Sequence, residues 1–377
     1  MSSGTDGPLA RLRYTPALDG VRGVSVLAVI GYHAISFPSG GFLGVQFFFV
    51  LSGFLITALL LQERAENGRI SLRAFYRRRA LRLLPALFVV MAAYLVISVI
   101  RFSVGDADAD GGLVRAVYSA LIGLGYVSNG VIAWHGNLPP GIQHLWSLAA
   151  EEQFYLVWPL ALVVLLRLRK SNALLLGVAS AGVVAVELHR LQLALAGAPE
   201  RRLYMAPDTT ADAILVGCIL GVLYCSGTLE RLVHTPLWRR GAVPLAVVML
   251  AVAGFLVPNT DFRPLYEWLM PLVVLGAAVL IAVAACSSTS PVTRVLNNRW
   301  LVSPGRISYG LYLWHPVFLY GLGVWLLLPS VVASFAAAHL SYAYIERPFL
   351  RRRRAAGAEH DRSEVPRPVP SPSLATP

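Results

Sequence analysis

The chain has 377 residues, of which 56% are hydrophobic and 14% are charged. Soluble domains average about 45–50% apolar and about 25% charged residues, so this composition argues against a soluble protein. The net charge is +12, but the arginines gather at the ends of apolar runs, as in cytoplasmic loops of membrane proteins. Nucleic-acid binding is therefore disfavoured. The three cysteines form no C-x-x-C pair, which argues against a disulfide framework or a zinc site.

Apolar runs long enough to cross about 30 Å of hydrocarbon recur along nearly the whole chain. The predicted fold is therefore all-α, a polytopic bundle of membrane-spanning helices. We expect ten spans, near residues 18–37, 42–63, 80–100, 145–167, 173–193, 208–225, 241–257, 267–286, 304–327 and 330–347.

Loop charges predict the orientation of these spans. Seven arginines between Arg64 and Arg82 place the loop after the second span, and therefore the N-terminus, in the cytoplasm. Counting back from the arginines at 351–354 places the C-terminus there as well. The two counts agree only if a further apolar run at 114–134 does not fully cross. This run contains three glycines and an asparagine, so we expect a re-entrant or interfacial segment.

The first predicted span contains three ionisable residues whose spacing indicates a function. Asp19 and Arg22 lie near its start, and His33 follows Arg22 by eleven residues. At 100° and 1.5 Å per residue, Arg22 and His33 share one helix face, three turns apart. Ionisable groups inside a span are costly and usually functional, and an imidazole can take a proton from a hydroxyl. We favour this role for His33 over that of a histidine satisfied within the core.

Three arginines lie at the start of the third predicted span, and Arg78 and Arg79 each precede Arg82 by one helical turn. Arginine binds phosphate groups in a bidentate manner. The same residues also suit a cytoplasmic flank with no ligand, and charge alone does not separate these two interpretations.

Further polar groups interrupt later apolar runs. Glu151 and Glu152 point about 100° apart on one helix, and spacing does not tell whether either carboxylate is catalytic or structural. Asp208 and Asp212 lie one turn apart, ahead of a small-residue packing pair, Gly217 and Gly221. His315 lies inside another predicted span. Glu346 and Arg347 are interpreted as a charged helix end at the membrane interface.

Taken in order, these motifs resemble the acyltransferase-3 family of integral membrane O-acyltransferases. The resemblance runs from about Leu18 to Phe349, and the order of the motifs makes it specific. The motifs are Asp19–Arg22–His33, Phe48–Thr57, Arg79–Arg82–Pro85, Trp146–Tyr155, Asp208–Gly217, Tyr309–Pro316 and Glu346–Phe349.

The resemblance implies a catalytic group and a donor site. The expected donor is acyl-CoA, with acetyl-CoA as the first choice, entering from the cytoplasm, and no metal is expected. His33 matches the family's proposed base, and the motif glutamate carries over to Glu152 and less firmly to Glu151. The predicted catalytic residues are His33, Glu152, Arg22 and Asp19. The predicted donor-binding residues are Arg79, Arg82, Arg78, Trp314 and His315.

Two residues depart from the family pattern. Gln46 stands where the family often has Asp, and Thr210 stands where it often has Arg. Neither touches the Arg–His motif, so they bear on the acceptor more than on the reaction type. The extra C-terminal hydrolase-like domain frequent in the family is not expected here, because only a short tail follows Phe349.

The predicted organisation is a cytoplasmic N-terminal leader (1–17), a membrane acyltransferase domain (18–350) and a basic, Pro-rich, disordered cytoplasmic tail (351–377). The expected location is the plasma membrane, with both termini cytoplasmic. The expected acceptor is a hydroxyl of a cell-surface glycan or of a secreted small molecule such as a macrolide. The alternative is a proton-coupled transporter or flippase that uses His33, Glu152 and Asp212 as a proton relay.

Overall fold

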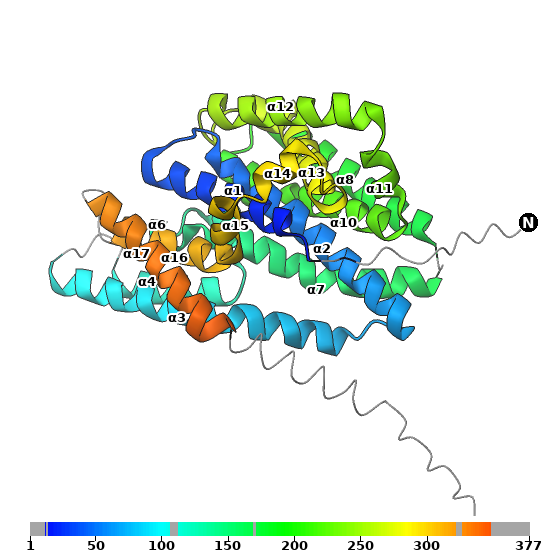
Figure 1. Ribbon diagram of the computed structural model, residues 1–377. Coiled ribbons are helices and arrows are strands. Elements are labelled where there is room, and N and C mark those ends of the chain that lie inside the picture. The colour runs from blue at the N-terminus through cyan, green and yellow to red at the C-terminus, as the bar shows by residue number, and fades with distance from the viewer. Residues whose placement is uncertain (1–11, 13, 106–111, 169–170, 322–325, 348–377) are drawn as a thin grey trace, which may run out of the picture.

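The computed structural model describes residue 12 and residues 14–105, 112–168, 171–321 and 326–347, and the regular elements of this part are all helical (Figure 1). The elements are α1 (Pro16–Ile35), η1 (Gly41–Leu43), α2 (Gly44–Asn67), α3 (Leu72–Ser103), α4 (Leu113–Leu124), α5 (Ser128–His135), α6 (Pro140–Gln143), α7 (Leu145–Leu168), α8 (Asn172–Leu195), α9 (Glu200–Met205), α10 (Pro207–Cys225), α11 (Thr228–Val233), η2 (Trp238–Ala242), α12 (Val243–Leu256), η3 (Leu265–Leu269), α13 (Met270–Cys286), α14 (Pro291–Leu296), α15 (Arg299–Arg306), α16 (Ser308–Gly321), α17 (Leu327–Leu340) and η5 (Ser341–Glu346).

Within the described residues, nine helical stretches are long and apolar enough to cross a membrane. They correspond to nine of the ten predicted spans and confirm the polytopic helical bundle. The remaining span, predicted at 304–327, corresponds to α16, which is described for 14 residues and stops short of 322–325, outside the described part. The count of ten therefore stays a prediction. The predicted tail and most of the predicted leader also lie outside the described residues.

The apolar run at 114–134 is not one helix. It divides into α4 and α5, and Tyr126 between them has a left-handed backbone with φ 53°. The amide of Gln153 on α7 donates to the Tyr126 carbonyl at 2.8 Å and forms two hydrogen bonds with Asn129. Broken backbone at membrane depth needs such protein partners, because lipid offers none. The run is therefore not one continuous helix, and its re-entrant or interfacial course stays a prediction.

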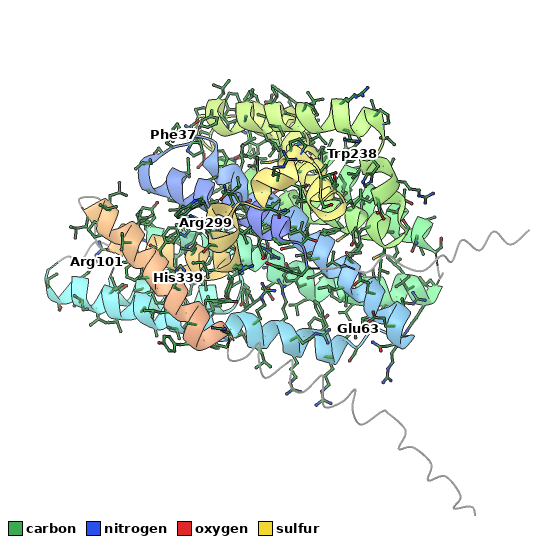
Figure 2. All side chains as sticks on the ribbon, viewed as in Figure 1. Phe37, Glu63, Arg101, Trp238, Arg299 and His339 are labelled. Carbon is green, nitrogen blue, oxygen red and sulfur yellow. The ribbon has the colours of Figure 1, made fainter. Side chains whose placement is uncertain are left out.

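Successive connections lie at opposite ends of the bundle. Figure 2 shows Phe37, after α1, and Arg101, at the end of α3, at one end of the molecule, and Glu63, near the end of α2, and Trp238 at the other. We call the end with Glu63 the α2–α3 end, after the loop at residues 68–71. Local signals mark the helix boundaries there. Gly68 ends α2 with φ 67°, as a C-terminal glycine does, and the Ser71 hydroxyl caps α3.

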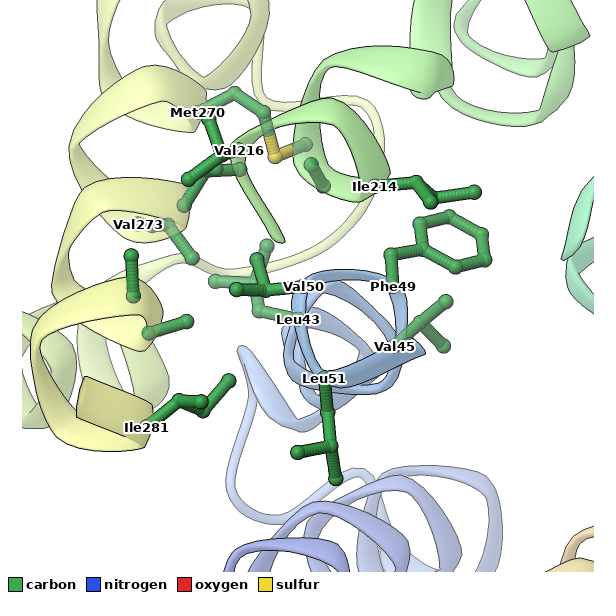
Figure 3. Close-up of a cluster of buried hydrophobic side chains, with 14 of the residues drawn as sticks. Leu43, Val45, Phe49, Val50, Leu51, Ile214, Val216, Met270, Val273 and Ile281 are labelled. Atoms are coloured by element: carbon green, nitrogen blue, oxygen red, sulfur yellow. The ribbon is translucent and has the colours of Figure 1, made fainter. Parts of the chain in front are cut away.

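Helix α2 lies at the centre of the main hydrophobic core. Its apolar side chains face α10 and α13, as Figure 3 shows for Phe49 and Val50 beside Ile214 and Val273. Both Phe49 and Val50 are fully buried. A helix that is apolar all round is expected only where protein or lipid surrounds it completely, and α2 meets that condition inside the bundle.

Glycines let α2 and α10 touch backbone to backbone. A Cβ atom on Gly53 would lie 1.9 Å from the Ile214 carbonyl oxygen, and one on Gly217 would lie 2.0 Å from that of Val50. Small residues allow this close approach between membrane helices, so the predicted packing role of Gly217 is confirmed. The contact fixes the position of α2 relative to α10. It thereby fixes the residues that α2 contributes to the candidate active site.

Replacing Gly217 with alanine should destabilise the protein, because the new methyl group can be accommodated only if α2 and α10 move apart. Overpacking of this kind costs about 1–3 kcal/mol. The matched control is Gly177→Ala on α8, where a Cβ meets nothing within 4 Å and alanine favours the helix. Thermal unfolding in detergent should show a lower midpoint for Gly217→Ala alone. Equal midpoints for the two variants would contradict the close contact.

Candidate active site

A cavity of about 160 Å³ lies inside the bundle and connects the charged motifs of three helices. Arg22 from α1, Arg79 and Arg82 from α3 and Glu151 from α7 supply its ionisable groups, and the rest of its wall is largely apolar or aromatic. The lining residues are Arg22, Val45, Phe48, Phe49, Ser52, Leu55, Ile56, Leu59, Arg79, Arg82, Leu83, Ser147, Leu148, Glu151, Tyr155, Ser308, Tyr309 and Tyr312.

A second, wider cavity of about 360 Å³ adjoins the first at the α2–α3 end of the bundle. The two cavities share Arg79 and Arg82 as lining residues. Arg78 lines only the wider one, where its guanidinium forms an ion pair with Glu63 at 3.0 Å. The predicted arginine group is therefore assembled in space, with two of its three members at the junction of the cavities.

Arg79 is held by partners on α7. Its guanidinium forms an ion pair with Glu152 at 3.2 Å and lies 3.5 Å from the centre of the Tyr155 ring. Stacking on an aromatic face and pairing with a carboxylate both hold the planar guanidinium in one orientation. Glu152 thus lies beside the predicted donor arginine. Its neighbour Glu151 lines the narrower cavity and accepts a hydrogen bond from Ser52 at 2.9 Å.

At the start of α1, Asp19 organises a second polar group. The Arg22 guanidinium donates to its carboxylate at 2.8 Å, and the Tyr14 hydroxyl donates to it at 2.9 Å. Arg306 at the end of α15 donates to the same tyrosine at 3.0 Å. The aspartate therefore orients Arg22 at the wall of the narrower cavity, and it is not itself among the residues that line that cavity.

Tyr312 and Ser147 form part of the wall of the narrower cavity. Their hydroxyl groups lie 2.5 Å apart, and the Tyr312 hydroxyl also donates to the His144 carbonyl at 3.0 Å. Behind this bridge, the Tyr312 ring packs against the imidazoles of His144 and His315, with ring centres 5.3 Å and 5.7 Å away. The bridge is thus the wall between the cavity and a cluster of histidines.

His33 belongs to that histidine cluster. Its Nδ1 lies 3.1 Å from Nε2 of His315, which is fully buried. His33 lies in the last turn of α1, three turns from Arg22 as predicted, and it does not itself line the narrower cavity. Trp314 stacks on Phe318 and belongs to a buried cluster with Ala86 and Leu87 of α3. His315 thus lies near the end of α1 opposite Arg22, and neither it nor Trp314, which were both grouped with the donor site, lines the two cavities that share Arg79 and Arg82.

The three residues of the alternative proton relay take part in separate interactions. Asp212 forms an ion pair with the buried Arg190 at 3.1 Å, while Glu152 pairs with Arg79 and His33 with His315. Within the described part of the chain, no hydrogen bond or ion pair joins Asp212 to either of the others. The geometry therefore offers little support for a relay, and Asp212 holds α8 against α10.

The two departures from the family pattern lie away from the cavities. Gln46 is buried in the first turn of α2, and the Thr210 hydroxyl donates to the Ala206 carbonyl at 2.9 Å within α10. Neither side chain lines the two cavities that share Arg79 and Arg82. Their positions are consistent with the expectation that they leave the Arg–His motif undisturbed.

Sequence reasoning did not single out three residues that the structure brings to the site. They are His144, Ser147 and Tyr312, which form the wall between the narrower cavity and His33. All three occur within motifs already noted, beside Trp146 or within Tyr309–Pro316. The sequence signal that could have identified them is a hydroxyl or an imidazole in an otherwise apolar span. Such groups usually face the interior of the bundle and are hydrogen-bonded there.

These features define a multi-pass membrane protein whose interior holds arginines, carboxylates and histidines around connected cavities. A family model described as an acyltransferase domain matches residues 15–343. The chain therefore belongs to this acyltransferase family, as the order of its motifs predicted.

Two curated relatives carry names that state a reaction of their own. The chain is 34% identical over 361 residues to a putative peptidoglycan O-acetyltransferase, YrhL, of Bacillus subtilis (strain 168), and 32% identical over 358 residues to the peptidoglycan O-acetyltransferase OatA of Listeria monocytogenes serovar 1/2a. Each alignment covers 89% of this chain, but 55% and 56% of the respective relative. The chain thus spans little more than half the length of these relatives. No solved structure matches it.

Proposed function

We propose that the protein transfers an acyl group, acetyl in the first instance, from acyl-CoA to a hydroxyl of a sugar-containing acceptor. The observation that carries the proposal is the pair of cavities that meet at Arg79 and Arg82. Acyl-CoA has a bulky nucleotide and a slender pantetheine arm joined by a diphosphate. A larger and a smaller cavity with arginines at their junction suit the two halves of such a donor.

In this arrangement the diphosphate contacts Arg79 and Arg82, and the thioester lies toward Tyr312 and Ser147. Arg22 adds positive charge to the wall of the narrow cavity, and Glu152 orients Arg79. Trp314 and His315, which the resemblance assigned to the donor site, lie outside this donor position in the proposal. Arg78 and its partner Glu63 line the nucleotide side.

His33 acts as general base in the proposed reaction. Its imidazole takes the proton of the acceptor hydroxyl as the oxygen attacks the thioester carbonyl carbon. The C–S bond breaks, the new ester forms, and the thiolate of CoA recovers the proton from the imidazolium. Because the ring lies behind Tyr312 and Ser147, their hydroxyl bridge must shift, or be displaced, when the thioester reaches the base.

The proposed acceptor is a cell-surface glycan, with peptidoglycan favoured over a secreted small molecule such as a macrolide. Support comes from the names of two relatives, one a peptidoglycan O-acetyltransferase and the other a putative one. A third cavity of about 130 Å³, lined by Tyr94, Arg101 and Tyr320, lies at the end of α3 opposite the arginine pair. In our proposal the α2–α3 end and both termini face the cytoplasm, the protein lies in the plasma membrane, and the acceptor approaches from the other side.

The full-length protein in detergent, incubated with radiolabelled acetyl-CoA and soluble muropeptides, should give acetylated muropeptide and free CoA in equal amounts. A parallel incubation with a macrolide tests the alternative acceptor class. Reconstituted vesicles loaded with muropeptide test the transporter alternative, because a transporter moves its substrate without acylating it. Movement of muropeptide with no ester product would contradict the proposal.

A further inference from the structure

His315 is a fully buried member of the histidine cluster, and each of its two ring nitrogens has a hydrogen-bond partner. Its Nδ1 lies 3.0 Å from the Leu311 carbonyl one turn earlier in α16, and its Nε2 lies 3.1 Å from Nδ1 of His33. The proposed reaction gives His315 no part, although the ring is in direct contact with the proposed base. The two contacts together restrict the protonation of both rings.

A carbonyl oxygen can only accept a hydrogen bond, so Nδ1 of His315 carries a proton. In a neutral imidazole one nitrogen donates and the other accepts, and Nε2 of His315 therefore presents a lone pair. Nδ1 of His33 must then donate to that lone pair. The proton of neutral His33 is consequently on Nδ1, which leaves its Nε2 unprotonated and available as the base.

We propose that His315 is a positioning residue that fixes the tautomer and orientation of His33, so that Nε2 of His33 is the basic nitrogen. The inference rests on the proposed function, in which His33 is the base. When Nε2 takes the acceptor proton, the Nδ1 proton stays in its bond to His315, and His315 remains neutral. The proton then passes from Nε2 to the departing thiolate, which returns His33 to its starting tautomer.

The surroundings of the pair explain why an imidazole serves here. The groups packed around the two rings are Tyr32, His144 and Tyr312. Within the described residues, His33 and His315 form hydrogen bonds with each other and with backbone groups, and neither pairs with a carboxylate. A carboxylate would need a costly desolvation in this apolar interior, whereas a neutral imidazole accepts a hydrogen bond without bringing charge.

The experiment compares two replacements of His315. Gln offers a carbonyl oxygen that can accept from Nδ1 of His33, and Leu offers no acceptor. His315→Leu should lower kcat by about 10²-fold, a low value for general-base catalysis, with the KM for acetyl-CoA within twofold of the parent value. His315→Gln should keep kcat within about tenfold of the parent value, since its acceptor group is retained.

The matched control is His339→Leu. His339 lies on α17, makes the same type of bond to a carbonyl one turn back, at 2.9 Å from Phe335, and is exposed. Its loss should leave both kcat and KM unchanged. Size-exclusion profiles and acetyl-CoA affinity establish that each variant is folded.

A second readout needs no activity. Carbon and nitrogen NMR shifts of isotopically labelled histidine in detergent distinguish the two neutral tautomers, and the His33 signals are assigned by their loss in His33→Ala. His33 should be protonated on Nδ1 in the parent and in His315→Gln, and should populate the Nε2-protonated form in His315→Leu. An unchanged tautomer in a folded His315→Leu protein would overturn the inference.

The outcomes also separate this inference from the proposed function. If His33→Ala is inactive while both His315 variants are fully active, only the positioning role fails. If His33→Ala retains full activity, the base assignment fails, whatever the tautomer. Equal loss of kcat in folded His315→Leu and His315→Gln would also overturn the positioning role, because the acceptor group would then have no effect.

Discussion

Replacing His33 with alanine should lower kcat for acetyl transfer by about 10²–10⁴-fold, the usual contribution of a general base. The physical reason is that the attacking hydroxyl would have no group to take its proton in a site shielded from water. The KM for acetyl-CoA should stay nearly constant, since His33 does not line the cavities proposed for the donor. Steady-state rates with varied acetyl-CoA and a fixed muropeptide concentration measure both quantities.

The His33→Ala protein should still fold, because the ring lies in the last turn of α1 and is half-buried. His339→Ala, on α17, serves as the control for loss of an imidazole elsewhere in the bundle. Parent-like kcat in a folded His33→Ala protein would exclude His33 as the base and leave the membrane fold unaffected. A raised KM with unchanged kcat would instead assign His33 to donor binding.

Replacing Arg79 with methionine should cause the largest loss of stability among the site variants. The change removes the guanidinium that pairs with Glu152 at 3.2 Å, and breaking a buried ion pair from one side costs about 3–5 kcal/mol. Because the Glu152 side chain is 15% exposed, the lower part of this range is expected. Thermal unfolding in detergent should show a clear drop in the midpoint, and any folded protein should bind acetyl-CoA weakly.

The double variant Arg79→Met/Glu152→Leu separates stability from donor binding. Removing both charges eliminates the unpaired carboxylate, so the unfolding midpoint should return toward the parent value. Acetyl-CoA affinity should stay low, because the proposed diphosphate site has lost one of its two arginines at the cavity junction. Recovery of affinity together with stability would show that Arg79 acts only as the partner of Glu152.

Much of the membrane architecture could be predicted from local patterns. Apolar length identified the spans, and the arginine-rich loop after α2 combined with small residues in 114–134 predicted that this run is broken. These signals are local in sequence, and hydrocarbon enforces them strictly because every backbone polar group must be paired. The spacing of Arg22 and His33 was also predictable, since both lie on one continuous helix.

The partners of the predicted residues could not be read from spacing. His33 meets His315 across 282 positions of sequence, and Arg79 meets Glu152 across 73. Contacts of this kind depend on which helices are neighbours in the bundle. Amphipathic patterning does not encode the choice of neighbour when nearly every helix face is apolar. The same limit applies to Tyr312. Among the aromatic residues of α16, it is set apart by the contact of its hydroxyl with Ser147 on α7, which the sequence does not reveal.

Helix α1 is held by close backbone contacts near its N-terminal end. Cβ atoms on Gly20 and Gly23 would lie 1.9 Å from the carbonyl oxygens of Leu296 and Leu301, so the backbone of α1 rests directly on its neighbours beside Arg22. Sliding or turning of the helix is blocked there. Each helical residue adds a rise of 1.5 Å and a rotation of 100°. The number of residues between Arg22 and His33 therefore sets both the position of the imidazole along the helix axis and the direction in which it points. A single inserted residue would turn the imidazole away from His315, whereas substitutions within the interval keep its aim.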